Sequence, residues 1–217
     1  MKYDDFIELA RKRRTIRKFT SKEVTREEVC KIIEAGRLAP SSFNSQPWEY
    51  VVVQDEALRL EIVRYLQAAM QGKTTEEVEV NMSVTFATAP TFIILYGDPR
   101  VRPFGPPHLI ADDILWDFNL ATTMATSFQQ MHLAATSLDL GAMWVSASHK
   151  AGVDEKIRAL LGIPKDLVLF ELMAVGHPDQ VANEKNLRNI EEITHWNMCG
   201  ETDFRTKEEV AKYFKKS

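Results

Sequence analysis

The segment 115–140 restricts the fold of this chain more than any other part of its sequence. It carries apolar side chains on nearly every side of a helix, among them Met124, Phe128 and Met131, and Gly141 follows it as the expected C′ residue. In a chain of 217 residues, such a helix is either the central helix of the core or part of a subunit interface. We interpret its methionines as core-filling side chains rather than as a cofactor site.

Shorter helices and apolar strands alternate along the rest of the chain. We expect strands at 48–53, 91–96, 142–146 and 167–175, and helices at 3–13, from Thr25 to Pro40, after Asp55, at 153–161 and after Thr206. In the first helix, Phe6, Leu9 and Ala10 should point inward. No turn between a strand and a helix carries a glycine-rich phosphate signature, so the sequence favours an α+β sandwich over a Rossmann sheet.

Local signals mark several element boundaries. Thr25 with Glu28 and Thr206 with Glu209 form T-x-x-E capping boxes, and Asp55 is the expected N-cap of the third helix. The segment 97–113 contains four prolines and two glycines, which exclude a long regular element. We therefore interpret it as a loop or lid.

Composition and length bound the class of protein. With 45% hydrophobic and 27% charged residues, the chain can bury a substantial core in one domain, or at most two small ones. It has no run of 18 apolar residues and no apolar h-region behind its N-terminal charges, which predicts a cytoplasmic protein without a membrane span. Cys30 and Cys199 form no CxxC motif, so we expect both to be reduced and without a role.

Several common catalytic motifs are missing from the sequence. It has no GxxxxGK[ST], GxGxxG, GxSxG or HExxH motif. Its five histidines stand apart from one another and from acidic residues at metal-ligand spacing, so we expect no metal site. The acid pairs 112–113 and 191–192 are typical of helix N-termini or solvated faces. An enzyme with this sequence would therefore rely on a cofactor for its chemistry.

Positive charge is concentrated at the N-terminus. Residues 1–37 hold eleven Lys and Arg against seven Asp and Glu, in a chain whose net charge is -4. The run RKRRTIRK, residues 11–18, has six basic residues and no acid. We expect an anion to bind near this run. Two alternatives stay open: the cations complement the C-terminal end of the first helix, or, as the less favoured alternative, they bind nucleic acid.

The stretch APSSFNSQPW, residues 39–48, places helix-breaking and polar residues directly ahead of a strand. By itself it indicates a loop in which Ser and Asn make local turn bonds. It occurs, however, together with RRTIRKF at 13–19, LGAMWVS at 140–146, AVGHP at 174–178 and KNLRNIEEITHW at 185–196. In this combination the chain resembles the nitroreductase family of FMN-dependent oxidoreductases, from about residue 5 to about residue 197.

The resemblance implies a set of residues that bind the FMN phosphate. Guanidinium groups bind phosphate oxygens in a bidentate manner and keep their charge. Arg13, Arg14 and Thr15 would contact the phosphate and the ribityl end, while Arg188, assisted by Lys185, would join them from the tail.

The resemblance also implies contacts with the flavin ring. Arg17 would lie toward the pyrimidine side, where positive charge raises the reduction potential. A flavin bound mainly by one subunit would contact a loop of the other subunit at four residues: Pro40, Ser41, Ser42 and Asn44. Gln46 and Pro47 would hold this loop.

No catalytic side chain is implied, because FMN carries the chemistry. A backbone N–H near Trp144, Val145 or Ser146 would point at flavin N5. Polar candidates for the pyrimidine edge between the first strand and the next helix are Gln67, Gln71, Lys73 and Asn81.

The fold and assembly implied by the resemblance are equally specific. We expect a three-layer sandwich with a central, mainly antiparallel sheet flanked by helices, in a single domain over 1–217. The proline-rich segment at about 97–113 would form a variable lid over the substrate pocket, and a tail at about 180–217 would wrap the partner subunit of a homodimer. One FMN would bind at each of two sites in the interface.

The implied activity is a ping-pong hydride transfer. NAD(P)H would reduce FMN, and an electron-poor acceptor such as a nitroaromatic or a quinone would then take the electrons. Two alternatives stay open: a specialised flavin enzyme that acts on a single metabolite, and a flavin-binding protein without turnover.

Overall fold

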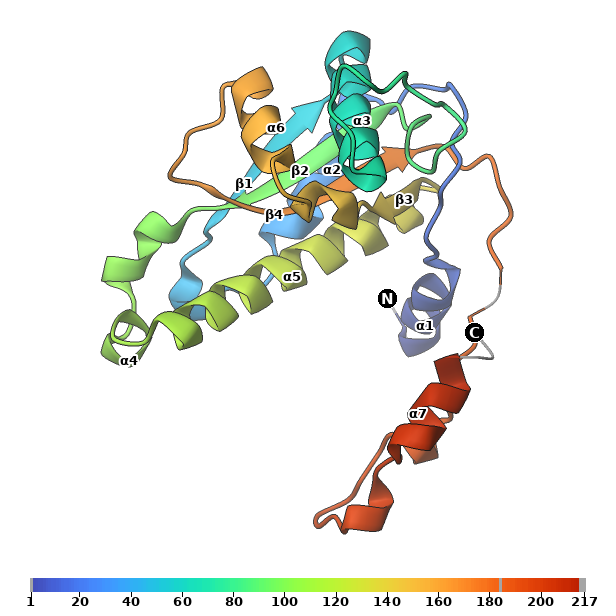
Figure 1. Cartoon of the computed structure of the whole chain (residues 1–217). Helices are drawn as coiled ribbons and strands as arrows, with labels where there is room; N and C mark the ends of the chain where they lie inside the picture. Colours follow the sequence, from blue (N-terminus) through green and yellow to red (C-terminus); the bar gives the residue numbers. More distant parts are fainter. Residues whose placement is uncertain (1, 184, 215–217) are drawn as a thin grey trace. The chain divides into compact units, whose positions relative to one another are not determined.

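The centre of the fold is a four-stranded antiparallel sheet (Figure 1). The computed structural model describes residues 2–183 and 185–214. The strands are β1 (Trp48–Val53), β2 (Thr91–Gly97), β3 (Gly141–Trp144) and β4 (Val168–Gly176), and their order across the sheet is β1-β2-β4-β3. Each neighbouring pair is antiparallel, which confirms the α+β interpretation and distinguishes this sheet from a parallel Rossmann sheet.

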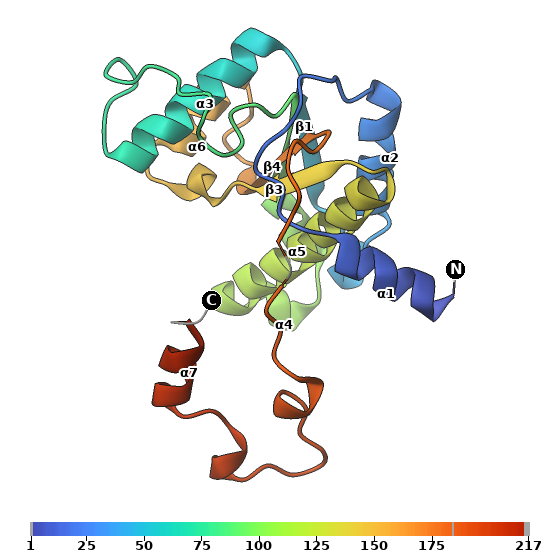
Figure 2. The ribbon, with the colours of Figure 1, turned by 90° about the vertical axis from the view of Figure 1, so that its right-hand side faces the viewer.

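Helices cover both faces of the sheet. The α-helices among the described residues are α1 (Tyr3–Lys12), α2 (Arg26–Arg37), α3 (Glu56–Gln71), α4 (Pro107–Ile110), α5 (Asp113–Ser137), α6 (Val153–Leu161) and α7 (Lys207–Phe214). Figure 2 shows α3 and α6 on one face of the strands and α2 and α5 on the other. This arrangement confirms the predicted three-layer sandwich, and β2 in its middle is buried along its whole length.

Capping side chains begin the helices as predicted. Thr25 Oγ1 accepts a hydrogen bond from the Glu28 N–H at 3.2 Å, and the Glu28 carboxylate accepts one from the Thr25 N–H at 2.8 Å. Asp55 and Asp112 cap α3 and α5 by accepting backbone N–H groups at 2.9 and 3.0 Å. Because these caps satisfy donors that a helix leaves free at its start, short local patterns determine where the helices begin.

The helix α5 is the central helix of the core. Met124 and Met131 are fully buried in the cluster that joins α5 to the sheet, which confirms their role as core-filling side chains. The first turns of α5 are less covered, and Ile114 and Phe118 are 84% and 66% exposed there. Neither α5 nor another helix within residues 2–183 and 185–214 is long and apolar enough to cross a membrane.

Gly141 does not have the predicted role at the end of α5. The helix ends at Ser137, and the residue with a left-handed φ after it is Asp139, at 58°. Gly141 instead begins β3, where a Cβ atom would lie 2.7 Å from the side chain of Ile16. The close approach of the N-terminal segment to β3, and not the end of the helix, therefore requires glycine here.

The first helix is less buried than its sequence predicted. Phe6 is 41% exposed, Leu9 and Ala10 are half-buried, and no residue of α1 is buried. The main contact of α1 is with α5. A helix that packs against a single other helix buries only a narrow stripe, so the inward placement predicted for Phe6 is wrong.

The proline-rich segment 97–113 contains only short regular pieces. These are a 3₁₀ segment, Pro99–Phe104, and the single turn of α4. The absence of a long element within this described segment agrees with its interpretation as a loop. Its role as a lid stays a prediction.

The chain divides into two compact units, Met1–Val181 and Ala182–Ser217. The division lies close to the expected start of the tail. In the second unit the predicted capping box begins α7, since Thr206 Oγ1 accepts the Glu209 N–H at 3.2 Å. A single domain over 1–217, and a tail wrapped around a partner subunit, stay predictions.

Candidate functional site

The basic N-terminal segment runs beside β3, at the edge of the sheet. Thr15 pairs with Ala142 in a parallel bridge, and the Ile16 N–H donates to the Ala142 carbonyl oxygen at 3.0 Å. The Arg17 N–H donates to the side-chain oxygen of Gln180 at 2.8 Å. The backbone of this segment is therefore fixed, while the side chain of Arg17 is exposed.

Arg13 and Arg14 bring two positive charges together at half-buried positions. Burial, and secondly the charge of Arg14, lowers the pKa of Arg13 below its usual range. Arg14 donates to the carbonyl oxygens of Arg11 and Arg13. Within the part of the chain that the structure describes, no carboxylate forms a salt bridge with Arg13. A bound phosphate would offset the repulsion between the two cations, so this pair fits the expected anion.

A buried histidine that the sequence did not single out lies close to Arg13. His132 on α5 is 6% exposed, and its Nδ1 has no hydrogen-bond partner among the described residues. Its ring is edge-on to Phe128 with the centroids 4.8 Å apart, and Phe128 makes a similar contact with Trp144 at 5.5 Å. These rings connect the surroundings of Arg13 with the end of β3. The sequence shows that Phe128 and His132 lie one turn apart on an apolar helix. It does not show that the positive charge of Arg13, from a distant segment, lies near His132.

We expect His132 to make the stability of the protein depend on pH. Burial, and secondly the charge of Arg13, lowers the pKa of His132 from its ordinary value of 6.5 to about 4. As the pH falls through this range, the unfolded chain binds a proton that the folded chain does not, so folding becomes less favourable. Between pH 7 and pH 5 the loss is worth about 2 kcal/mol, and a His132→Leu variant should lack it.

Urea unfolding at both pH values and one protein concentration measures this difference. Between pH 7 and pH 5, the parent protein should lose about 2 kcal/mol more stability than His132→Leu. His108→Leu makes the same substitution at an exposed histidine on α4 and serves as the control. Equal losses in the parent and in His132→Leu would contradict the prediction.

The loop 40–47 has an unusual backbone conformation. Asn44 and Gln46 have φ values of 55° and 43°, a region that residues other than glycine rarely adopt. Ser41 Oγ accepts the Gln46 N–H at 3.1 Å, the Gln46 side chain donates to Asn44 at 3.2 Å, and the Pro47 carbonyl oxygen accepts the Asp98 N–H at 2.7 Å. The local turn bonds expected of Ser and Asn are therefore formed, and Gln46 and Pro47 hold the loop as predicted. Strained backbone of this kind is concentrated at functional sites.

In one copy of the chain, this loop and the N-terminal arginines lie on opposite sides of α5. The Ser42 N–H donates to Thr123 Oγ1 at 3.4 Å, whereas the charge of Arg13 acts on His132. Thr123 and His132 are nine residues apart, which is about two and a half turns at roughly 3.6 residues per turn, so they face opposite directions. A single copy therefore does not bring loop 40–44 and Arg13 to the same side of the helix.

The segment expected at flavin N5 leaves the sheet at the end of β3. The Val145 N–H donates to the Leu172 carbonyl oxygen at 2.9 Å, so this amide is already used. Ser146 is exposed and begins the 3₁₀ segment Ser146–His149, whose first N–H groups have no acceptor within the segment. Trp144 is 53% exposed. Of the three candidates, Ser146 is best placed to offer its N–H to a ligand.

Two of the four polar residues suggested for the pyrimidine edge, Gln67 and Asn81, hydrogen-bond to each other. Gln67 is 1% exposed, and its side chain donates to the Asn81 carbonyl oxygen at 2.8 Å and accepts the Asn81 N–H at 2.9 Å. The Asn81 side chain accepts the Ser83 N–H at 2.9 Å. Gln67 and Asn81 therefore hold the loop after α3 in place. Gln71 and Lys73 are exposed at the end of this helix.

The tail unit contains the remaining candidates for the phosphate site. Arg188 donates through Nη2 to the Glu192 carbonyl oxygen at 2.7 Å, and its Nε lies 3.8 Å from the Glu192 carboxylate. These contacts hold the Arg188 side chain within the tail unit. A contribution of Arg188 and Lys185 to an FMN phosphate stays a prediction.

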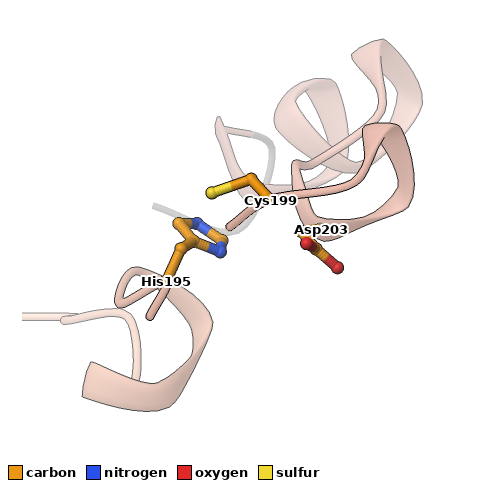
Figure 3. A group of neighbouring side chains, drawn as sticks. All are labelled: His195, Cys199 and Asp203. Carbon is orange, nitrogen blue, oxygen red and sulfur yellow. The ribbon is translucent and has the colours of Figure 1, made fainter. Parts of the chain in front are cut away.

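Three potential metal ligands lie together in the tail (Figure 3). Ligand atoms of His195, Cys199 and Asp203 are all within 4.8 Å of one another, so the sequence-based view of His195 as isolated from acidic residues is wrong. All three residues are exposed, and the Asp203 carboxylate already accepts the Gly200 N–H at 2.6 Å. Exposed groups of these types commonly lie together without an ion, so we assign no metal to this cluster.

Comparison with known proteins connects these observations. The model of the Nitroreductase family matches residues 10–177, which is more than half of the chain. NADH dehydrogenase of Thermus thermophilus is 26% identical over 208 residues, which cover 86% of this chain and 93% of that protein. Iodotyrosine deiodinase 1 of Mus musculus is 25% identical over 200 residues, which cover 87% of this chain and 67% of that protein.

Solved structures give a similar result. The NADPH:FMN oxidoreductase of Vibrio harveyi, complexed with NAD+, matches with a TM-score of 0.71 at 26% identity, over 97% of this chain and 83% of that one. A BluB-like flavoprotein from Clostridium difficile shares the fold with a TM-score of 0.70 at 22% identity, over 91% and 100%. The region 10–177 includes the N-terminal arginines, loop 40–47 and segment 144–146, and it ends before the tail.

Proposed function

This chain belongs to the nitroreductase family, and we propose that it passes hydride from NAD(P)H, by way of FMN, to an electron-poor acceptor such as a nitroaromatic or a quinone. Family membership and the likeness to an NADPH:FMN oxidoreductase identify it as an FMN-dependent NAD(P)H oxidoreductase. The two half-reactions would follow a ping-pong order, in which the nicotinamide leaves before the acceptor binds at the same place.

The observation that carries this proposal is the pair of half-buried arginines beside β3. FMN supplies the hydride chemistry when it is bound, and the residues of the chain bind and orient it. Arg13, Arg14 and Thr15 would hold the phosphate and the ribityl end, and Arg188 and Lys185 would add positive charge from the tail. Since Arg13 has no salt-bridge partner among the described residues, an anionic ligand would lower the electrostatic energy of the site.

The ring would be oriented by groups with a fixed backbone. The side chain of Arg17 projects from a segment that Gln180 anchors, and it would place positive charge toward the pyrimidine side. The exposed Ser146 N–H would donate toward N5. The backbone that carries each group is held before a ligand binds, by Gln180 at Arg17 and by the Val145–Leu172 hydrogen bond next to Ser146, which reduces the entropy that binding costs.

A second copy of the chain would complete the site. Pro40, Ser41, Ser42 and Asn44 would come from the partner, because in one copy loop 40–44 and Arg13 lie on opposite sides of α5. The N-terminal half of α5 supports a homodimer, since exposed apolar residues recur there at helical spacing: Ile114, Phe118, Ala121 and Ala125. A cytoplasmic location belongs to the same proposal.

The test is a measurement of the visible spectrum of the purified protein. We expect a yellow flavin spectrum, bleaching by NADH or NADPH without air, and return of the colour on addition of a quinone or a nitroaromatic. Protein that is colourless and does not bind added FMN would contradict the proposal. Bound flavin that neither nicotinamide reduces would instead favour a flavin-binding protein without turnover.

A specialised enzyme acting on a single metabolite is the second candidate. The similarity to iodotyrosine deiodinase 1 favours it, because that protein is named for one aromatic substrate. We place the choice of acceptor in the proline-rich segment 97–113. A panel of quinones, nitroaromatics and halogenated phenols under one set of conditions separates the candidates, since a broad enzyme should reduce many of them at similar kcat/KM and a specialised one should strongly prefer one class.

A further inference from the structure

Glu171 is a buried carboxyl group in an otherwise apolar strand. It is 6% exposed in β4, whose sequence is VLFELMAVG. One carboxylate oxygen lies 3.1 Å from Nε2 of His149, and the other is buried without a hydrogen-bond partner among the described residues. Burial raises the pKa of Glu171 above its usual range, against the opposing effects of His149 and of the Trp144 side chain. An incompletely satisfied carboxyl group in this position costs stability, because an apolar side chain of similar volume is often as stable or more stable there.

The strand register places Glu171 beside the candidate flavin site. Side chains alternate along a strand, so Glu171 lies on the same face of β4 as Met173. Met173 belongs to the core cluster between the sheet and α5, and it is directly opposite Trp144 on β3. Glu171 is therefore a diagonal neighbour of Trp144, at the point where the chain leaves β3.

Glu171 contacts His149 at the end of the turn that follows β3, and it is the diagonal neighbour of Trp144 at the start of that turn. Trp144 is the last residue before this turn, and His149 is its final residue. Inside the turn, Ser148 Oγ donates to the Val145 carbonyl oxygen at 3.0 Å and is fully buried. Contacts at its start and at its end therefore hold the turn in place. Its first residue, Ser146, is exposed, and the next, Ala147, is half-buried.

We propose that Glu171 is a positioning residue of the flavin site, which through Trp144 and His149 fixes the turn that presents the Ser146 N–H to the bound flavin. This rests on the proposed function, because the role is defined by FMN. This role explains why an otherwise apolar strand contains a carboxyl group: the group holds the neighbouring turn in place. Removal of the carboxyl group should leave the sheet intact and release the turn.

Two substitutions at one position separate positioning from packing. Glu171→Leu removes the polar contacts and fills the space with an apolar side chain, whereas Glu171→Gln keeps an oxygen that can accept a hydrogen bond from His149. We expect flavin-free Glu171→Leu to unfold at the same or a higher temperature than the flavin-free parent, and yet to bind FMN about 2- to 30-fold more weakly and to shift the reduction potential of the bound flavin. Glu171→Gln should stay within about 2-fold of the parent in FMN affinity.

The outcomes distinguish this proposal from the proposed function. If the parent binds FMN and Glu171→Leu keeps the parent's affinity and potential, the positioning role is wrong and the proposed function stands. If Glu171→Leu loses thermal stability and FMN affinity together, and Glu171→Gln restores neither, the residue is structural. A parent that binds no FMN overturns both proposals. If Glu171→Leu fails to fold, the variant His149→Phe tests the proposal instead. Unchanged FMN affinity and reduction potential in His149→Phe would also exclude a positioning role for Glu171.

Discussion

FMN should bind about 10- to 150-fold more weakly to an Arg14→Ala variant than to the parent protein. The substitution removes one charge-assisted contact with the phosphate, which is worth about 1.5 to 3 kcal/mol. Arg14 is half-buried beside Arg13, and a phosphate bound there would offset the repulsion between the two cations. Titration of the flavin-free protein with FMN, followed by the quenching of flavin fluorescence, measures the dissociation constant.

Two further variants give this experiment its specificity. Lys18→Ala removes the same charge from an exposed position in the same basic run, and it should change the FMN affinity far less than Arg14→Ala does. Arg188→Ala tests the tail and should weaken FMN binding by a similar factor to Arg14→Ala, provided that the tail reaches the phosphate. Unchanged FMN affinity in both arginine variants would mean that the phosphate lies elsewhere.

A mixed dimer should bind FMN at about half of its sites with the affinity of the parent, although each of its two chains binds FMN weakly as a homodimer. One chain carries Arg14→Ala, and the other carries Ser42→Asp with Asn44→Asp, which adds two negative charges to the loop. Aspartate tolerates the left-handed φ of 55° at Asn44, and Ser42 contacts Thr123 through its backbone, so the loop should keep its conformation. If each site combines the arginines of one chain with the loop of the other, one of the two sites in the mixed dimer is intact.

Co-expression with two affinity tags and sequential purification isolates the mixed dimer, and its flavin content is read from the visible spectrum. Restoration requires that the loop and the arginines act from different chains. If both came from the same chain, each site in the mixed dimer would carry one defect and no flavin would return. The homodimers of each variant, purified in the same way, give the background occupancy. The expectation follows from the opposite positions of Thr123 and His132 on α5.

Signals within a few residues predicted the elements well. The strand at Trp48–Val53 and the helix at Val153–Leu161 have the predicted bounds, and the helix after Thr25 begins at its predicted cap. Each depends on a cap, a stop residue or an apolar run, which act on the backbone nearby. Phe6 and Gly141 were misjudged for a common reason. Burial of Phe6 depends on which elements pack against α1, and the need for glycine at 141 comes from Ile16, which lies far away in the sequence.

The candidate site was predictable as a set of motifs but not as a geometry. Residue types alone identified the arginines, the loop and the segment after β3. Each contains residues that a helix or strand at that position would not need. The roles of His132 and Glu171 were not identifiable. The function of each residue depends on neighbours that are distant in the sequence. For His132 on its apolar helix the neighbour is Arg13, and for Glu171 in its apolar strand the neighbours are His149 and Trp144.

The sequence by itself determined the secondary structure, the α+β class and the concentration of positive charge near the N-terminus, because these follow from local backbone chemistry and from the order of residue types. Only the tertiary structure decided that the N-terminal segment runs beside β3, that Arg13 lies close to a buried histidine, and that loop 40–44 lies on the other side of α5. The physical reason is distance along the chain: pairs such as Thr15 with Ala142 depend on how the whole core closes, and no local pattern encodes that.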